Sequence, residues 1–416
     1  MANNKKFLFK EETSVLFATF SLWTQGKRMP TNGSIEPLRD FLVPKIRKLV
    51  IIDELHPGSE EVIPKIEEYR NHNIEFISHT PSVLVQLMKP ILELTNQNAT
   101  QVTFKIRDFI TVISWVFQDK DSYDYFIGLE SINALAGIIL RRFGKIKEVI
   151  YYVSDYSPNR YPNKLFNSVY LWLDRYCAKH ADYIWDVSKA MHPARREAGL
   201  DLRASAPEIH VPNGLLPGQI KINSISKLVK HSLVYMGTLG SENGPDIAIV
   251  ALSKVVKKYP RAILHIVGGT KSDAVWLKEV ARKYSVQNSV IFHGFIPDSL
   301  QMSKIIRSCY VGLAPYKDIP GSIRKYADAG KIRAYCASGI PTISSQVPPL
   351  GLEVAELGGA MIVKDDPDTF AEAIIKIFSN NRLYRSLRRN AILFAKNSTW
   401  EHTFNNAFIA MSNSKK

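Results

Sequence analysis

Glycine-rich turns follow several apolar runs in the second half of the chain, where they could hold a phosphate group. After SLVYMG (232–237), the loop GTLGSENGPD contains Gly237, Gly240 and Gly244 and leads into a helical pattern. Glycine lets backbone N–H groups approach an anion closely at the start of a helix. This loop therefore suits a diphosphate, and the alternative is a glycine-rich turn that binds no ligand.

Three further loops have a similar character. Gly268 and Gly269 follow the next apolar run, Gly294 follows the one after it, and the basic GSIRK (321–325) comes later. In a parallel sheet the carboxyl ends of the strands lie along one edge, and open α/β sheets bind their ligands there. Four such loops in order predict an anion site on that edge.

Other chemical motifs fail on inspection. GGTKS (268–272) resembles the end of a phosphate-binding P-loop, but Thr270 separates glycine from lysine and the upstream glycine spacing is wrong. The three cysteines, Cys177, Cys309 and Cys336, are far apart and have no CxxC spacing. We therefore expect no disulfide framework, no metal site and a reducing cytoplasm.

Charge is distributed unevenly along the chain. The 416 residues carry a net charge of +15, with 27 Lys and Arg against 25 Asp and Glu in residues 1–215, and 27 against 14 in residues 216–416. A basic half could attract nucleic acid, anionic lipid or a phosphorylated small molecule. A merely solubilising surface is the alternative, and charge alone does not decide.

Strands and helices alternate from Ser232 onward, as in repeated strand–helix–strand units of a parallel sheet. The predicted strands are 232–237, 262–268, 289–295, 310–315 and 341–345. The predicted helices are 246–259, 273–284, 299–309 and one that contains KIRAYCASG (331–339). The second half is therefore expected to be a doubly wound α/β domain of the nucleotide-binding type.

The first half is less regular but similar in kind. Its predicted strands are 14–23, 48–53, 74–78, 125–130, 148–155 and 182–188. HVPNGLLP (210–217) has two prolines and an Asn-Gly turn, so it predicts a stiff hinge between two α/β domains. The segment from Asp366 to about Met411 is expected to form three helices, one of which could pack back across the boundary.

Membrane-spanning segments are not expected. The longest apolar-rich run, INALAGIIL (132–140), is about half of a bilayer span, and charged residues interrupt the N-terminal apolar run before a signal-peptide core forms.

Motifs in both halves resemble those of GT-B glycosyltransferases, in particular glycosyltransferase family 4 and its relatives. In the second half these are VYMGTLGSENGPD, LHIVGG, VIFHGFIP, YVGLAPY, KIRAYCASGIPTI and Trp400, in that order. HVPNG resembles the hinge motif of the family. YDYFIGLESINALAGIIL, YYVSDYSPNRYPN and ADYIWDVSKAM look like the acceptor domain of bacterial sugar transferases.

The resemblance implies two Rossmann-like doubly wound domains that face a cleft. Residues 1–212 would bind the acceptor, residues 213–395 the nucleotide sugar, and 396–416 would form a C-terminal helix that could cross back. It also implies transfer of a sugar from a nucleotide diphosphate sugar, a UDP- or GDP-sugar, with retention at the anomeric carbon and without a metal or other cofactor. Fixed N–H dipoles and cations would stabilise the departing diphosphate.

The resemblance also implies a set of donor-binding positions. The Gly237 loop would face the phosphates, Phe295 and Ile296 the base, and Lys331 is the strongest candidate cation, with a solvated helix lysine as its alternative. The full set of donor-binding candidates is Gly33, Gly237, Thr238, Asn243, Gly269, Phe295, Ile296, Arg324, Lys325, Lys331 and Tyr335.

Four positions depart from the family pattern. Thr238 and Asn243 stand where the family commonly has a phosphate-binding Arg and Lys, and Tyr326 and Ala334 stand where it commonly has two glutamates. The second glutamate normally binds the ribose, and losing such a charged hydrogen bond costs roughly 1.5–3 kcal/mol. Asp328 is close enough in sequence to replace it in part.

In the first half, Asp155 of VSDYSPNR (153–160) ends a strand where relatives often have His-Asp facing the reacting sugar. Asp155 is therefore the catalytic candidate, to orient a hydroxyl or balance positive charge, and an ordinary turn-forming Asp is the alternative. Gly33, in TNGSIEP (31–37), is the candidate for close approach to the diphosphate.

Three functional hypotheses follow. The leading one is a retaining transferase of bacterial surface polysaccharide synthesis, cytoplasmic and possibly at the inner face of the cell membrane, with a glycan or lipid-linked acceptor. Residues 163–180 mix aromatic and cationic side chains as a helix at an anionic membrane surface would, although core packing is the alternative.

The second hypothesis is a catalytically silent GT-B protein that binds a nucleotide sugar or a partner enzyme. A nucleic-acid binder is the third, and no nucleic-acid partner is expected because the basic half has no reading motif.

Overall fold

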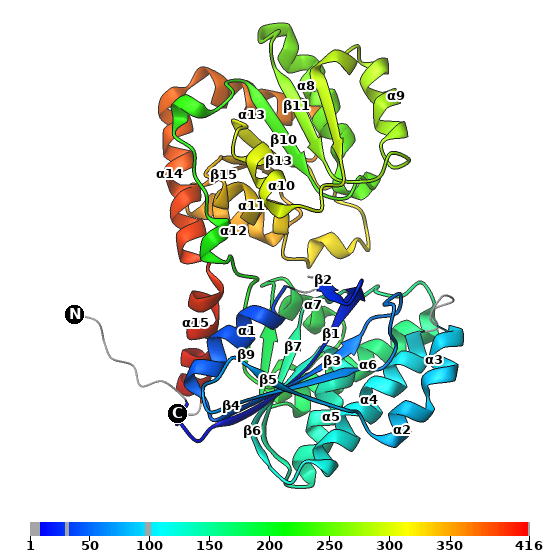
Figure 1. Ribbon diagram of the computed structural model, residues 1–416. Coiled ribbons are helices and arrows are strands. Elements are labelled where there is room, and N and C mark those ends of the chain that lie inside the picture. The colour runs from blue at the N-terminus through cyan, green and yellow to red at the C-terminus, as the bar shows by residue number, and fades with distance from the viewer. Residues whose placement is uncertain (1–8, 30–32, 96–100, 415–416) are drawn as a thin grey trace, which may run out of the picture. The chain divides into compact units, whose positions relative to one another are not determined.

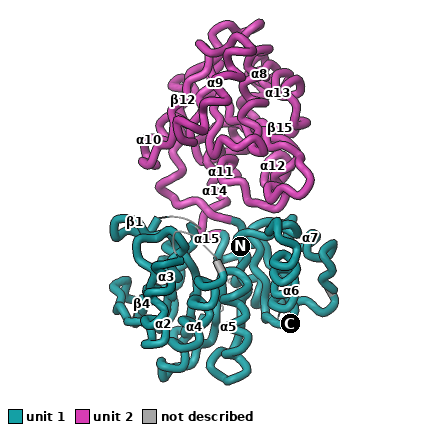
Figure 2. Tube along the Cα trace, turned by 90° about the vertical axis from the view of Figure 1, so that its right-hand side faces the viewer, with its two compact units in different colours: residues 1–212, 403–416 teal, residues 213–402 magenta. Residues whose placement is uncertain are grey.

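The computed structural model describes residues 9–29, 33–95 and 101–414, which divide into two compact units. Unit 1 comprises residues 1–212 and 403–416, and unit 2 comprises residues 213–402 (Figure 2). Each unit is built on one mainly parallel sheet with helices on its faces (Figure 1).

The sheet of unit 1 has the strand order β5-β4-β3-β1-β6-β7-β8-β9, and β2 pairs with β1. Its strands are β1 Ser14–Thr24, β2 Lys27–Met29, β3 Lys48–Leu55, β4 Lys65–Arg70, β5 Phe76–His79, β6 Tyr123–Leu129, β7 Ile146–Val153, β8 Tyr183–Asp186 and β9 Glu208–His210. β1 is parallel to both β3 and β6, with Phe17 opposite Ile51 and Ile127. β4 is antiparallel to β3 and β5.

The helices of unit 1 cover both faces of this sheet. They are α1 Ile35–Leu42, α2 Val83–Leu87, α3 Lys89–Thr95, α4 Gln101–Gln118, α5 Glu130–Arg142, α6 Lys164–His180 and α7 Met191–Glu197. The last helix of the chain, α15 Trp400–Ser414, packs with Phe404 and Phe408 against Phe41 of α1 and Trp185 of β8. The end of the chain thus completes the core of unit 1.

The sheet of unit 2 is wholly parallel, in the order β12-β11-β10-β13-β14-β15. Its strands are β10 Ser232–Met236, β11 Ile263–Val267, β12 Val290–Gly294, β13 Val311–Ala314, β14 Thr342–Ser345 and β15 Ala360–Val363. Its helices are α8 Pro245–Lys258, α9 Val275–Lys283, α10 Ser299–Ile306, α11 Gly330–Ala337, α12 Pro349–Glu356, α13 Pro367–Ser379 and α14 Asn381–Asn397. Counted in chain order this is 3-2-1-4-5-6, the order of doubly wound nucleotide-binding sheets.

The predicted strands of both halves are confirmed, with ends shifted by at most two residues. The strands β2, β4, β9 and β15 were not predicted. The expected α/β class with two Rossmann-like domains is also confirmed. Among the described residues, no helix is both long enough and apolar enough to cross a membrane.

The chain passes between the units twice, at Pro212–Asn213 and at His402–Thr403. Next to these crossings, Leu215 pairs with Thr399, and a Cβ on Gly214 would lie 2.4 Å from the backbone nitrogen of Trp400. Only glycine fits at position 214, so the two crossing segments are held in close contact.

Candidate donor and acceptor sites

The strand order of unit 2 reverses between β10 and β13, and doubly wound sheets bind their ligand at the carboxyl ends of such a pair. The loop that begins at Gly237 leaves β10 at this point, and the segment that contains Pro315 and Tyr316 leaves β13. A nucleotide site of unit 2 is therefore expected between these two loops.

Lys331 of α11 lies at this point of the sheet. Its side chain is buried, with 6% of the residue exposed, and its Nζ has no hydrogen-bond partner among the described residues. The Nζ lies 4.1 Å from the ring centroid of Tyr235, on β10, and 4.3 Å from that of Tyr316, after β13. Two aromatic faces thus hold the amine at the switch point of the sheet, without an acceptor.

Burial and a neighbouring cation both disfavour a positive charge on Lys331. Burial, and then the nearby Arg324 cation, lower the pKa of Lys331 well below its ordinary value. A buried amine without a partner is costly because desolvation disfavours its charged form. An anionic ligand beside the Nζ would restore the charge, so the geometry suits a phosphate.

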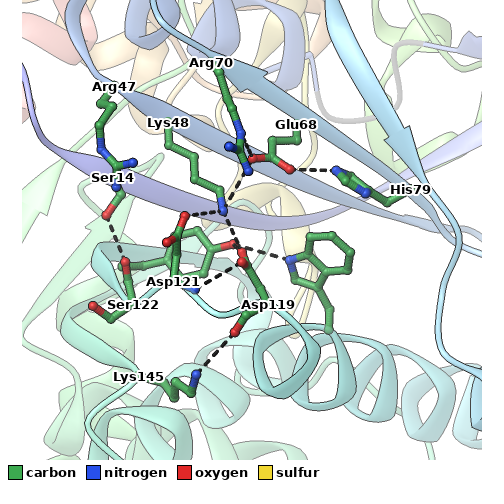
Figure 3. Close-up of polar contacts among 12 residues, drawn as sticks. Ser14, Arg47, Lys48, Glu68, Arg70, His79, Asp119, Asp121, Ser122 and Lys145 are labelled. Carbon is green, nitrogen blue, oxygen red and sulfur yellow. Dashed lines mark hydrogen bonds and ion pairs between the residues drawn. The ribbon is translucent and has the colours of Figure 1, made fainter.

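Lys48 is the contrasting case in the same molecule (Figure 3). It is equally buried at the start of β3, but its Nζ lies 2.7 Å from Asp119, 2.9 Å from Asp121 and 3.4 Å from Glu68. Burial alone would lower the pKa of Lys48, but hydrogen bonds to the two aspartates outweigh it and raise that pKa. The buried amine of Lys48 is thus surrounded by carboxylates, whereas among the described residues no carboxylate forms a hydrogen bond with the Lys331 amine.

The glycines of the predicted anion loops have different roles. Gly237, with φ +131°, has an open Cα face: a Cβ there would lie 3.4 Å from Cε and 3.6 Å from Nζ of Lys331. A Cβ on Gly244 would lie 1.7 Å from the Pro315 carbonyl oxygen, on Gly268 2.1 Å from the Gly237 carbonyl oxygen, and on Gly269 2.5 Å from Leu239. Those three glycines are required by packing, and Gly237 is the one that faces the lysine.

Thr238 and Asn243, which replace two expected cations, bind each other. The Asn243 side-chain amide donates to Thr238 Oγ1 at 2.9 Å, and the Tyr235 hydroxyl donates to the Thr238 carbonyl at 2.6 Å. The two residues therefore close the glycine loop on itself and add no positive charge to it.

The other predicted cations are already paired. Arg324 forms an ion pair of 3.1 Å with Glu242 of the glycine loop, while Lys325 forms one of 2.5 Å with Asp318. Arg324 remains close enough to Lys331 to lower its pKa, so it belongs to the same site. Lys325 is directed to Asp318, away from that cluster of contacts.

The remaining donor-binding candidates of unit 2 differ in how far their side chains are exposed. Phe295 is 70% exposed, as a residue that stacks on a base could be, and Ile296 packs against the apolar cluster around Val234 and Val267. Tyr335 is fully buried; its hydroxyl accepts from the Met236 N–H at 2.9 Å and donates to the Leu313 carbonyl at 3.0 Å. Tyr335 ties β10 to β13 below the site and presents no exposed atom to a ligand.

The carboxylate of Asp328 already has hydrogen-bond partners. Its carboxylate accepts hydrogen bonds from Arg333 at 2.9 and 3.0 Å and from the Asn213 N–H at 2.8 Å. Both charged side chains are at most 5% exposed. Asp328 links α11 to the crossing segment and is not placed to stand in for the missing ribose-binding glutamate at Ala334.

In unit 1, sequence reasoning missed Glu130. It directly follows β6, the neighbour of β1 at the point where the strand order of this sheet reverses, and has φ +65°. This left-handed conformation is costly for a residue with a side chain and is often kept at functional sites. Its carboxylate accepts hydrogen bonds from the Ser154 N–H at 3.1 Å and the Ser154 hydroxyl at 2.8 Å. Nothing in the sequence reveals the φ angle.

Glu130 brings Asp155 into a charged cluster. Asp155 forms an ion pair of 3.1 Å with Arg160 and keeps 46% of its side chain exposed. Burial raises the pKa of Glu130, the Arg160 cation lowers it, and Asp155 raises it again. The cluster thus combines a buried carboxyl group with an exposed carboxylate at the ends of β6 and β7. Gly33, with φ +66° and open space at its Cα, precedes α1, and residues 31 and 32 of its motif lie outside the described residues.

One group of side chains in the described part of unit 1 approaches a metal-ligand arrangement. Atoms of Asp186, His192 and Glu208 lie within 4.8 Å of one another. Arg195 donates to both oxygens of Asp186, and His192 Nδ1 lies 2.6 Å from Glu208. Burial, followed by the Asp186 charge, raises the pKa of Glu208 to about 8. Ion pairs and a proton on Glu208 account for this cluster, and we assign it no ion.

Comparison with known proteins agrees with this geometry. Residues 230–380 match the family model of Glycosyl transferases group 1. No curated protein sequence matches the chain at a significant level.

Solved structures with the same fold cover nearly the whole chain. The HepE structure from Anabaena in complex with UDP is 15% identical, covers 97% of this chain and 100% of its own, and has a TM-score of 0.66. Sucrose-phosphate synthase from Thermosynechococcus elongatus is 12% identical, with 97% and 98% covered and a TM-score of 0.67. WaaG, a glycosyltransferase involved in lipopolysaccharide biosynthesis, is 11% identical, with 96% and 99% covered and a TM-score of 0.56.

The chain therefore has the GT-B fold, and residues 230–380 of unit 2 are similar to the group 1 glycosyltransferases. By this domain and this fold it is a glycosyltransferase of the GT-B type, and the class predicted from the sequence motifs is confirmed.

Proposed function

We propose that the chain transfers a sugar from a UDP-sugar bound by unit 2 to a glycan or lipid-linked acceptor bound by unit 1, with retention at the anomeric carbon. The observation that carries this proposal is the buried, partnerless Nζ of Lys331 at the switch point of the sheet. UDP is preferred because the HepE structures contain UDP, UDP with glucose, or UDP-glucose.

In this proposal Lys331 is the cation that replaces the two lost at Thr238 and Asn243. The bond from the anomeric carbon to the β-phosphate oxygen breaks, and a bond to the acceptor oxygen forms. The acceptor proton passes to the departing diphosphate, whose charge Lys331 and Arg324 stabilise. Asp155, with Glu130 behind it, orients the reacting hydroxyl.

The proposed setting is bacterial surface polysaccharide synthesis in the cytoplasm, at the inner face of the cell membrane. Support comes from the fold shared with WaaG, whose role is in lipopolysaccharide biosynthesis. No metal takes part in the proposed chemistry.

The test is a panel of UDP- and GDP-sugars, measured for binding and for slow release of free sugar. Lys331→Met should weaken UDP-sugar binding by roughly tenfold to a hundredfold, the value of a charged hydrogen bond. Lys257→Met, at an exposed lysine of α8, is the matched control and should bind normally. Unchanged binding by Lys331→Met would overturn the assigned site.

The second candidate is a catalytically silent protein that binds a nucleotide sugar. The replacement of both glutamates by Tyr326 and Ala334, together with the uncharged pair Thr238 and Asn243, favours it. Tight donor binding with no hydrolysis and no transfer across the panel would establish this alternative.

A further inference from the structure

The outward side of α6 is unusually apolar for an exposed helix. Leu165, Phe166, Val169 and Trp172 are 73%, 53%, 54% and 57% exposed, and we call these four residues the α6 stripe. The opposite side of the helix is buried, through Leu173, Asp174, Cys177 and Ala178. The expectation that this helix packs in the core therefore explains only half of its apolar residues.

Charges around the α6 stripe have one sign. Lys164 and Lys179 are exposed near the two ends of the helix. The single acid of α6, Asp174, is fully buried and paired with Arg195 at 3.1 Å. The outer side of α6 thus presents large apolar groups between cations and offers no carboxylate.

Aromatic side chains with polar edges continue the α6 stripe. The rings of Trp172 and Tyr176 stack with centroids 5.7 Å apart, and Arg142 donates to the Tyr176 hydroxyl at 3.2 Å. Trp and Tyr rings in this setting suit the boundary between headgroups and acyl chains.

A second apolar surface lies in the same helical layer. Helices α2 to α6 lie next to one another in unit 1, with α4 and α5 between α3 and α6 (Figure 2). The exposed large apolar residues of α2 and α3 are Val83, Leu84, Leu87, Ile91 and Leu94. Exposed apolar surface of this extent marks an interaction site, since soluble monomers rarely leave it uncovered.

We infer that the α6 stripe and its flanking lysines dock unit 1 onto an anionic lipid surface. Apolar side chains would enter the headgroup boundary while Lys164 and Lys179 contact anionic headgroups. A lipid surface fits better than a protein partner because Lys164 and Lys179 are exposed at the two ends of α6, while the one acid of the helix is buried. The inference rests on the membrane setting of the proposed function and names the surface that makes the contact. Vesicle binding needs no donor, so the failure of this inference and the failure of the proposed donor site can be told apart.

The experiment is flotation of the full chain with phosphatidylcholine vesicles, with and without phosphatidylglycerol. The chain should bind the anionic vesicles, and binding should weaken as salt rises because the lysine contribution is screened. Brominated lipids should quench the fluorescence of the wild-type chain more than that of Trp172→Phe. Equal binding to both vesicle types, or none to either, would overturn the inference.

Single substitutions test whether the α6 stripe is the surface that binds the vesicles. Phe166→Ser should weaken binding to anionic vesicles about tenfold, and Lys179→Glu should weaken it at least fivefold. Leu393→Ser is the matched control, because Leu393 of α14 in unit 2 is 57% exposed, close to the 53% of Phe166, and it should bind as the wild type does. Circular dichroism and donor hydrolysis in solution should be unchanged in all three. If Phe166→Ser instead dissolves a dimer and leaves vesicle binding intact, the stripe is an interface between copies and the inference is wrong.

Discussion

At the scale of single residues, the donor site depends on one lysine that the fold keeps unpaired. Burial, and then the Arg324 cation, lower the native pKa of Lys331, so between the native and the unfolded pKa the native chain binds fewer protons there than the unfolded chain does. This difference costs stability, and the cost grows as the pH falls from about 10 toward the native pKa. If Lys331 binds the donor as proposed, its burial therefore lowers stability at a position that serves binding.

Lys331→Met tests this trade-off. We expect the variant to melt at a higher temperature than the wild type near pH 7, because a buried unpaired amine is replaced by an apolar side chain of similar size. The difference should shrink as the pH rises through the unfolded pKa of lysine, about 10.4, because above it the amine is neutral in both states. Thermal unfolding across this range is the measurement, and a variant that is less stable at every pH would contradict it.

The same group predicts a pH dependence of donor binding. The groups that face Lys331 are the Arg324 side chain and the rings of Tyr235 and Tyr316, and burial raises the pKa values of both tyrosines. Burial thus lowers the pKa of the lysine and raises those of the two tyrosines, so the lysine titrates before them as the pH rises, and a diphosphate raises its pKa on binding. Affinity for UDP should fall as the pH rises through the window between the free and bound pKa values. Calorimetric titration in buffers of different ionisation enthalpy should show proton uptake, and no buffer dependence would contradict this.

Glu130 and Asp155 predict a different phenotype in unit 1. Glu130→Gln keeps the size of the side chain but removes the charge behind Asp155, and Asp155→Asn removes the exposed carboxylate. Both should slow sugar transfer, Asp155→Asn by about a hundredfold or more, as for loss of a positioned acid or base. Neither should change affinity for UDP, because the donor site lies in unit 2. A shift in UDP affinity as large as the loss in rate would refute this division of roles.

At the scale of elements, α11 joins the donor site to the crossing segment. Lys331 and Arg333 lie on the same short helix, and Arg333 reaches the Asn213 backbone through Asp328. Removing one partner of a buried ion pair leaves the other charge uncompensated. Asp328→Ala should therefore lower the free energy of unfolding by about 3–5 kcal/mol.

Chemical denaturation of the full chain measures this effect. The surface pair of Lys325 and Asp318 provides the control, since Asp318→Ala removes an exposed contact worth at most about 1 kcal/mol. If the two substitutions had equal effects, the buried link between α11 and Asn213 would have no structural role.

Element prediction from the sequence succeeded where apolar runs alternate with amphipathic helices, as in β10, α8 and β11. It failed for β4, KIEEYR. In this strand the buried Glu67 pairs with Arg28 and the buried Glu68 pairs with Lys48, so the strand lacks the alternation of apolar and polar residues by which strands are predicted. β9, with three residues, is too short to stand out from the loops beside it.

At the site, the sequence identified positions but not environments. Lys331 and Gly237 are far apart in the chain, and only the fold shows that they touch and that the amine lacks a partner. Tyr335 looked like a ligand residue because of its place in the motif, yet the ring fills the space beside Gly312. Glu130 could not be singled out from the sequence, because the feature that distinguishes it is its positive backbone φ angle.

At the scale of the whole molecule, the two units divide the chemistry and the surface between them. Unit 2 contains the cation and glycine loop proposed for the donor, while unit 1 contains the acidic cluster and the α6 stripe. The central claim is that the partnerless Lys331 is the site of the donor diphosphate.

The most direct test is a crystal structure of the full chain with UDP. The account predicts the Lys331 Nζ at a hydrogen-bond distance, about 2.7–2.9 Å, from a β-phosphate oxygen beside Gly237. A pyrophosphate bound elsewhere, with the Nζ still unpaired between Tyr235 and Tyr316, would contradict it.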